Sequence, residues 1–136
     1  QGQLTSATCS IAQKATKTAM LAEPKEVTTI MKDTFLKRRD MLLEKLNEIP
    51  GIRCNIPKGA FYIFPDVSYY FGKKDGEELI KNSNDLCMYL LNKAHVALVS
   101  GAAFGNPECI RISYAASDEK LMKAAKRIKE KLAELR

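Results

Sequence analysis

The sequence has few of the residues that build metal sites and disulfide frameworks. It contains one histidine, His95, and four widely separated cysteines, with no Cys-x-x-Cys pair. A structural zinc site needs closely spaced ligand pairs, so no metal site is expected. A chain of 136 residues can bury a hydrophobic core without cross-links. We therefore expect all four cysteines to be free thiols: Cys9, Cys54, Cys87 and Cys109. Free thiols are typical of a reducing compartment, so we expect the protein to be cytoplasmic.

Long apolar runs and clustered positive charge are also missing. No segment approaches the roughly 20 apolar residues that a membrane-spanning helix needs, and the polar first residues do not resemble a signal peptide. The net charge is +6, but half of the excess lies in residues 118–136, where bases and acids alternate without an aromatic residue. Such a pattern is typical of a solvated helix face, whereas nucleic-acid binding favours clustered cations with aromatic stacking partners. Neither a membrane nor a nucleic acid is an expected partner.

Helical patterns alternate with apolar runs along the chain. Pro24 separates the first two helical patterns, and Pro50-Gly51 ends the second. Ser83 and Ser117 are the expected N-caps of the last two, because a serine side chain can accept hydrogen bonds from the first free backbone N–H groups. The four predicted helices cover residues 10–22, 24–47, 83–93 and 118–136.

Four short segments are strand-like: residues 52–56, 60–64, 96–99 and 109–114. The first two flank the turn Pro57-Lys58-Gly59 and predict a hairpin. Residues 66–81 are expected to be a loop with little regular structure. The fold class that follows is α/β, with a small mixed or antiparallel sheet packed against helices.

One arginine stands in an apolar strand pattern. Arg111 lies on the strand face opposite Ile110, Ile112 and Tyr114, and it follows the glycine-flanked loop 100–105. A strand arginine often just reaches solvent or a structural carboxylate. Alternatively, its planar guanidinium can grip a carboxylate or phosphate with two parallel hydrogen bonds, and glycine backbone lets a ligand approach closely. The residues alone leave both interpretations open.

Three motifs keep a common order and spacing along almost the whole chain. They are residues 2–13, residues 57–62, and residues 96–105 followed by 110–115. Together they resemble the C-terminal small domain of class I/II aminotransferases, which are pyridoxal-phosphate enzymes of fold type I, like aspartate aminotransferase. The resemblance implies a parent enzyme that moves an amino group between an amino acid, aspartate-like, and a 2-oxo acid. It also implies a homodimer.

The resemblance assigns roles to particular residues. Arg111 matches the arginine of the family's Arg-x-Ser-Tyr/Phe-Ala strand, which binds the α-carboxylate of the substrate. Thr5 and Ser6 are expected near the dimer interface and the neighbouring subunit's site. Phe104 and Gly105 are expected to line the approach to the pocket, although loop packing would explain them as well.

The family's Schiff-base lysine motif has no match in this sequence, and neither does its glycine-rich phosphate-binding turn. Pyridoxal chemistry needs a lysine amine. We therefore expect a fragment without a catalytic residue of its own, with no cofactor bound covalently to it and no activity alone; the first residue, Gln1, fits this interpretation. Residues 1–22 would end the large domain, and residues 23–136 would form the small domain with a linking helix at 24–47.

Two other classes remain open at this point. One is a stand-alone, non-catalytic domain that binds carboxylates or a partner protein through the same fold. The other is a basic interaction module that acts through the final helix, for which salt-sensitive retention on a polyanion would be diagnostic.

Overall fold

The computed structural model of the protein describes residues 8–21 and 25–136. These residues fall into two units, which divide between Thr34 and Phe35. One long helix runs through the boundary between them. The expected division into a large-domain end and a small domain concerns a longer protein and stays a prediction.

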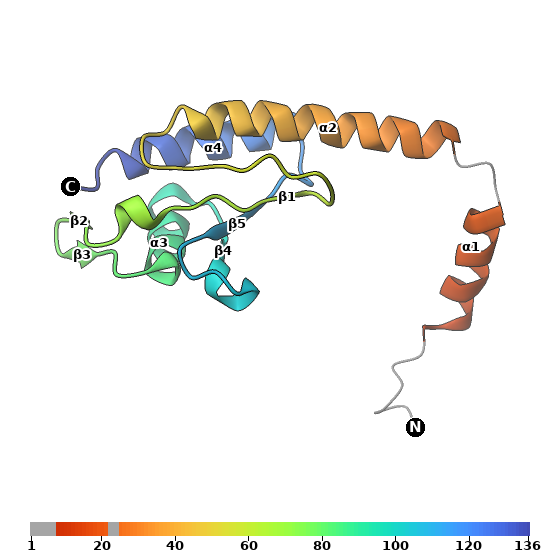
Figure 1. Ribbon diagram of the computed structural model, residues 1–136, viewed down its shortest axis with the longest axis horizontal. Helices are drawn as coiled ribbons and strands as arrows, with labels where there is room; N and C mark the ends of the chain where they lie inside the picture. Colours follow the sequence, from red (N-terminus) through yellow and green to blue (C-terminus); the bar gives the residue numbers. More distant parts are fainter. Residues whose placement is uncertain (1–7, 22–24) are drawn as a thin grey trace, which may run out of the picture. The chain divides into compact units, whose positions relative to one another are not determined.

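Helices and short strands alternate in the described residues, as Figure 1 shows. The α-helices are α1 (Ser10–Leu21), α2 (Lys25–Asn47), α3 (Ser83–Tyr89) and α4 (Asp118–Leu132). A π-helical turn, η2 (Leu90–Ala94), extends α3, and η1 (Ser68–Tyr70) and η3 (Gly101–Phe104) are short 3-10 helices. The strands are β1 (Tyr62–Ile63), β2 (Lys74–Asp75), β3 (Glu78–Leu79), β4 (Val99–Ser100) and β5 (Ile110–Ser113). The predicted α/β class is confirmed.

The principal sheet is antiparallel, with the strand order β1-β5-β4. Tyr62 pairs with Ser113, and Val99 pairs with Arg111. Because paired residues share a face and successive residues alternate, these four side chains lie on one face of the sheet. The other face carries Ile63, Ile110 and Ile112, which are buried in the core.

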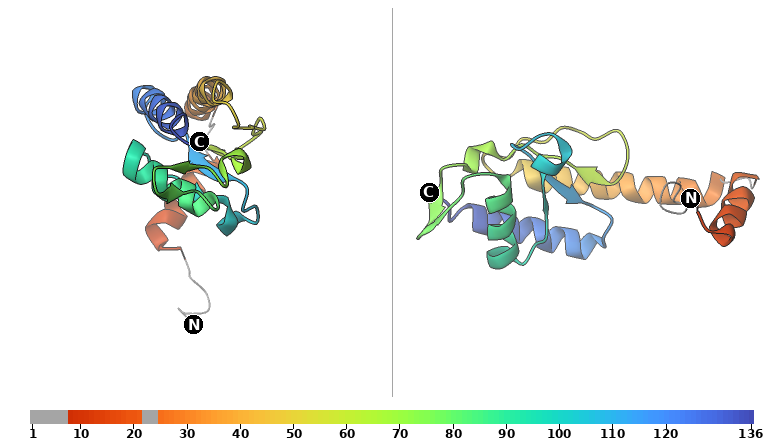
Figure 2. Two further views of the ribbon diagram at one scale, coloured as in Figure 1. Left: turned by 90° about the vertical axis from the view of Figure 1, so that its left-hand side faces the viewer. Right: turned by 90° about the horizontal axis from the view of Figure 1, so that it is seen from below.

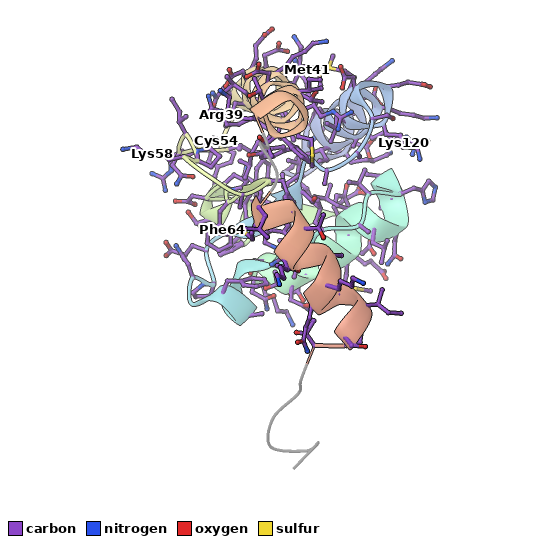
Figure 3. The ribbon with its side chains drawn as sticks, turned by 90° about the vertical axis from the view of Figure 1, so that its right-hand side faces the viewer. Arg39, Met41, Cys54, Lys58, Phe64 and Lys120 are labelled. Carbon is purple, nitrogen blue, oxygen red and sulfur yellow. The ribbon has the colours of Figure 1, made fainter. Side chains whose placement is uncertain are left out.

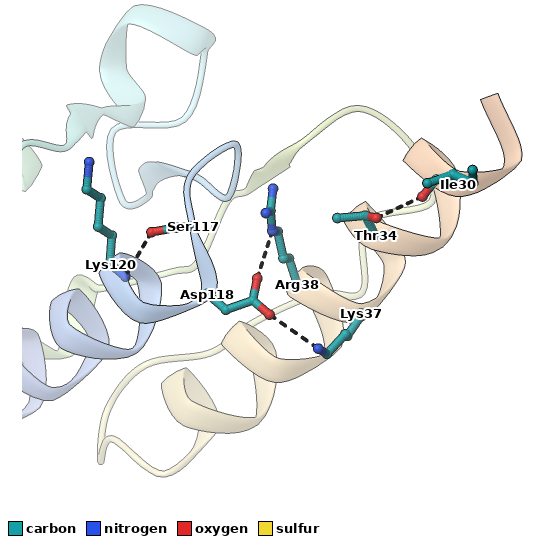
Figure 4. Close-up of polar contacts among 7 residues, drawn as sticks. All are labelled: Ile30, Thr34, Lys37, Arg38, Ser117, Asp118 and Lys120. Atoms are coloured by element: carbon teal, nitrogen blue, oxygen red, sulfur yellow. Dashed lines mark hydrogen bonds and ion pairs between the residues drawn. The ribbon is translucent and has the colours of Figure 1, made fainter. Parts of the chain in front are cut away.

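Helices α2 and α4 supply much of the core that covers the buried face. The second half of α2 runs beside α4 and in the same direction (Figures 1 and 2). Asp118 at the start of α4 forms ion pairs with Arg38 at 2.9 Å and Lys37 at 3.3 Å (Figure 4). The apolar side chains buried between these elements include Leu42, Leu46, Leu121, Ala125, Ile128 and Leu132.

The helical period of residues 24–47 predicts an apolar stripe along the helix, and this stripe faces the core only in the second half of α2. Leu42 and Leu46 are almost fully buried, whereas Ile30 is 61% exposed and Met31 is 53% exposed. The apolar spacing does continue along the helix, but no part of the described chain covers its first half. Helical periodicity identifies a face without identifying what packs on it.

The hairpin expected around residues 57–59 is wrong. Strand β1 pairs with β5, and Arg53 forms an isolated bridge with Asp66. Pairing with β5 places Ile63 wholly inside the core, whereas Ile56 on the first expected strand stays 70% exposed. Residues 54–61 form a wide loop instead, which Arg39 ties to α2 by donating to the Pro57 carbonyl at 3.1 Å. Arg39, Cys54 and Lys58 lie on the same side of the ribbon in Figure 3.

Three smaller expectations also need correction. Residues 66–81 contain more regular structure than expected, because β2 and β3 form a two-stranded antiparallel sheet there. The N-cap of α3 is Asn82, whose side chain accepts from the backbone N–H groups of Asn84 and Asp85. The helical period of residues 83–93 would place Leu91 on the inward face, but Leu91 is 42% exposed; it lies in the π-helical turn η2, which departs from that period. The expected cap of α4 at Ser117 is confirmed by its bond to Lys120 N.

Candidate functional site

Arg111 lies in the middle of β5 on the open face of the principal sheet. Its side chain is half-buried. Arg38 and Arg53 each form an ion pair with a carboxylate of this chain, but Arg111 forms none with any described acid. A structural carboxylate is therefore not what holds this arginine in the described part of the chain, and its N–H donors are available to a ligand.

Two aromatic rings contact the Arg111 guanidinium. The guanidinium carbon lies 4.5 Å from the centroid of the Tyr62 ring and 4.1 Å from that of Phe104. Both distances are typical of cation–π contacts, in which the ring stacks on the flat guanidinium. Phe64 supports Phe104 in an edge-to-face contact, with the ring centroids 6.5 Å apart.

The loop that carries Phe104 is held by its own backbone. Ser100 caps η3 by accepting from Ala102 N at 3.3 Å, and Gly101 N donates to the Cys109 carbonyl at 2.8 Å. A Cβ at Gly101 would lie only 2.3 Å from the Asn106 carbonyl oxygen, so the close approach requires glycine. Gly105 ends the turn at a φ of +83°, a conformation that glycine adopts without strain.

The structure brings together some of the predicted site residues. Phe104 contacts Arg111 directly, and Gly105 follows as the cap of the same turn. A contact between Gly105 and a ligand stays a prediction. Thr5 and Ser6 lie outside the described residues.

Sequence reasoning missed Tyr62 as a site residue. It belongs to the motif at 57–62, but its place beside Arg111 depends on the pairing of β1 with β5. The expected hairpin hid that pairing. The available signal was the alternation around Ile63, since a buried Ile63 places its neighbour Tyr62 on the opposite face, with Arg111.

Three of the four cysteines, Cys54, Cys87 and Cys109, are poor nucleophiles because burial raises the pKa of their thiols. Burial raises the pKa of the Cys54 thiol and of the Cys87 thiol to about 11. Burial, followed by the nearby Asp66 and Glu108 carboxylates, raises the pKa of Cys109. These three thiols therefore stay protonated near neutral pH, where the reactive form is the thiolate.

Within residues 8–21 and 25–136, no cluster of three metal-ligand side chains is present. No described helix is both long and apolar enough to cross a membrane.

The environment of the lysines bears on whether this chain can hold pyridoxal phosphate covalently. A lysine that forms an imine with this cofactor is activated by an enclosed, desolvated site. Every lysine whose side chain is described is exposed or half-exposed, and no described lysine makes a cation–π contact with the Tyr62 or Phe104 ring. Lys58 and Lys120, for example, point outward on opposite sides (Figure 3). The described residues of this chain therefore do not fit a covalently bound pyridoxal phosphate by themselves.

The sequence is similar to known transaminating enzymes. The family described as aminotransferase class I and II matches residues 1–128. A Petunia hybrida protein named bifunctional aspartate aminotransferase and glutamate/aspartate-prephenate aminotransferase is 48% identical over 140 aligned positions, covering all of this chain and 29% of that protein. The aspartate/prephenate aminotransferase of Cereibacter sphaeroides is 43% identical, covering 94% of this chain and 32% of its own length.

Solved structures of the same kind share the fold. The aspartate aminotransferase from Rhizobium meliloti matches 87% of this chain with a TM-score of 0.82 and 39% identity, over 30% of its own length. The Thermus thermophilus aspartate aminotransferase with maleate matches 96% with a TM-score of 0.79 and 31% identity, over 32% of its length. The chain thus spans about a third or less of these proteins. Family match, relatives and fold agree: this chain belongs to the class I and II aminotransferases.

Proposed function

We propose that this chain is part of a pyridoxal-phosphate-dependent aminotransferase and that it supplies the substrate-binding arginine, Arg111. The observation that carries the proposal is an arginine on an open sheet face, held by two aromatic rings and without an ion pair to any described acid. The parent enzyme would transfer an amino group between an amino acid and a 2-oxo acid. Aspartate is the proposed amino donor, because it appears in the names of the most similar relatives.

In this proposal Arg111 binds the α-carboxylate of the amino acid. Its guanidinium can donate two parallel hydrogen bonds to the two carboxylate oxygens, which fixes both the position and the plane of that group. A fixed carboxylate restricts rotation of the rest of the substrate, and such orientation lowers the barrier for the reacting atoms. Arg111 would therefore position the substrate without itself moving a proton.

Pyridoxal phosphate, when bound, supplies the electron sink of amino-group transfer. Since no lysine with a described side chain is enclosed, we assign its covalent attachment to the part of the parent outside this chain. We accordingly propose that the 136 residues alone do not transaminate.

The assembly and location of the parent are further parts of the proposal. We propose a homodimer with Thr5 and Ser6 near its interface, on the strength of the family resemblance alone. A cytoplasmic location is supported by the cysteines, because all four are free thiols.

The direct test is Arg111→Lys in the full-length parent enzyme. A lysine keeps the charge but cannot reproduce the two-pronged contact. Hydrogen bonds to charged groups are worth about 1.5–3 kcal/mol, so we expect KM for the amino acid to rise about 10- to 100-fold. Steady-state kinetics would measure it.

The matched control is Arg53→Lys. Arg53 forms an isolated β-bridge outside the strands; its side chain is 75% exposed and pairs with Asp66, so KM should not change. A normal KM in Arg111→Lys would refute the assignment.

A further inference from the structure

A long side chain such as arginine binds a carboxylate well only if its orientation is restricted beforehand. Fixing the rotamers of a free arginine costs conformational entropy, and this cost would otherwise be subtracted from the binding energy. In the described chain no hydrogen bond or ion pair restricts the Arg111 guanidinium; its contacts are the rings of Tyr62 and Phe104. Among the described residues, these two rings are therefore the contacts that restrict the guanidinium.

The two rings reach Arg111 from different parts of the chain. Tyr62 comes from β1, where its pairing with Ser113 puts it on the same sheet face as Arg111. Phe104 comes from η3, whose backbone is held by Gly101 and by the bond from Ser100. Strand β1 is held by its pairing with β5, and η3 is held by the hydrogen bond from Gly101 N to the Cys109 carbonyl, just before β5. Different backbone contacts therefore position the two rings.

The surroundings of the rings support a role beyond core packing. Phe104 is 48% exposed and Tyr62 is half-buried, so neither ring is placed by deep burial. A ring stacked on the flat side of a guanidinium occupies none of its N–H donors, which lie in the plane. Carboxylate binding and aromatic stacking can therefore occur together.

We propose that Tyr62 and Phe104 are positioning residues that hold the Arg111 guanidinium ready to receive a planar carboxylate. The inference rests on the proposed function, in which Arg111 binds the substrate α-carboxylate. Tyr62 and Phe104 lower the ordering cost of the arginine, and they exclude water from the parts of the guanidinium that they cover. Because the two rings act through Arg111, they should strengthen the binding only of ligands that carry a carboxylate.

The test uses the full-length parent with Tyr62→Leu and Phe104→Leu, made separately. Calorimetric titration would measure the affinity for maleate. Steady-state kinetics would compare kcat/KM for an amino acid with kcat/KM for its α-amide. Restricting one arginine is worth about 0.5–1.5 kcal/mol, so each variant should weaken maleate binding about 3- to 10-fold. The preference for the amino acid over its α-amide should fall by a similar factor. Phe104→Trp and Tyr62→Phe keep a ring, so these variants should retain both the maleate affinity and the preference for the amino acid over its α-amide.

The control is Tyr69→Leu. Tyr69 also carries a cation over its ring, Lys73 Nζ at 4.4 Å, but it has no contact with Arg111, so maleate affinity should not change. Thermal melting of each variant identifies any that are misfolded. Tyr62 and Phe104 are changed separately, so the test can be read from either leucine variant that folds.

The possible results separate the two claims. If Arg111→Lys weakens maleate binding but both leucine variants bind normally, the positioning role is overturned while the proposed function stands. Equal weakening toward the amino acid and its amide would mean general damage to the site, and it too overturns the positioning role. If Arg111→Lys itself binds maleate normally, the proposed function fails and the inference fails with it.

Discussion

At the scale of single residues, the site depends on positions where no larger side chain fits. Gly101 brings the backbone of η3 against the Asn106 and Cys109 carbonyls. This contact fixes the position of the turn from which the Phe104 side chain reaches Arg111. Arg111 could be singled out from the sequence because a charged residue in an apolar strand beside a glycine-flanked loop is a local signal, whereas Phe104 was expected at the site only through the family resemblance. Tyr62 could not be singled out, because its role is created by a strand pairing between distant segments.

Gly101→Ala should destabilise the protein and displace η3. The new Cβ would lie 2.3 Å and 2.4 Å from two carbonyl oxygens, and overpacking of this kind costs about 1–3 kcal/mol. Urea unfolding of the 136-residue chain would measure the loss. Gly59→Ala is the control, since a Cβ there has open space around it, and a change within about 0.5 kcal/mol is expected. Equal effects of the two substitutions would contradict the close contact at Gly101.

At the scale of elements, the positions of helices and strands were predicted better than the pairing of the strands. The first two helices, predicted at 10–22 and 24–47, are found at Ser10–Leu21 and Lys25–Asn47, because a long periodic pattern and a proline are properties of one local segment. Strands β1, β4 and β5 overlap the segments predicted at 60–64, 96–99 and 109–114, but local patterns could not fix their exact ends or show that β1 pairs with β5. The start of α3 shows the same limit, since Asn82 and Ser83 are adjacent and both are good caps.

Asn82→Ala should shorten or weaken α3. The Asn82 side chain accepts from Asn84 N at 2.9 Å and from Asp85 N at 3.0 Å, so its removal leaves two N–H groups of the first turn without that partner. The expected loss is about 1 kcal/mol of unfolding free energy, measurable by urea denaturation. Asn84→Ala, at an exposed position in the same turn, should cost much less; a comparable loss would argue against the cap.

At the scale of the whole molecule, a few charged contacts link segments that are distant in the sequence. Glu48, just after α2, contacts Lys45 at 2.7 Å and Lys129 of α4 at 2.9 Å. The hydrogen bonds from Lys45 and then Lys129 lower the pKa of Glu48 to about 2. Asp118 makes a second link of this kind at the other end of α4, where hydrogen bonds from Arg38 and then Lys37 lower its pKa.

The lowered pKa of Glu48 predicts how this contact responds to acid. Because the folded-state pKa lies below the ordinary value of 4.5, ionised Glu48 stabilises the fold above pH 4.5, and the contribution disappears as the pH falls toward about 2. Urea midpoints of wild type and Glu48→Gln should therefore differ most near neutral pH and converge in acid. The exposed location makes the difference small. A difference that grows on acidification would have the wrong sign for this account.

Binding of the substrate carboxylate by Arg111 would be visible in a crystal structure of the full-length parent with maleate bound. We expect one maleate carboxylate in the plane of the Arg111 guanidinium, with two N–O distances of about 2.7–2.9 Å, and with the Tyr62 and Phe104 rings still against that group. A carboxylate held by other residues, with Arg111 directed into solvent, would contradict this role of Arg111.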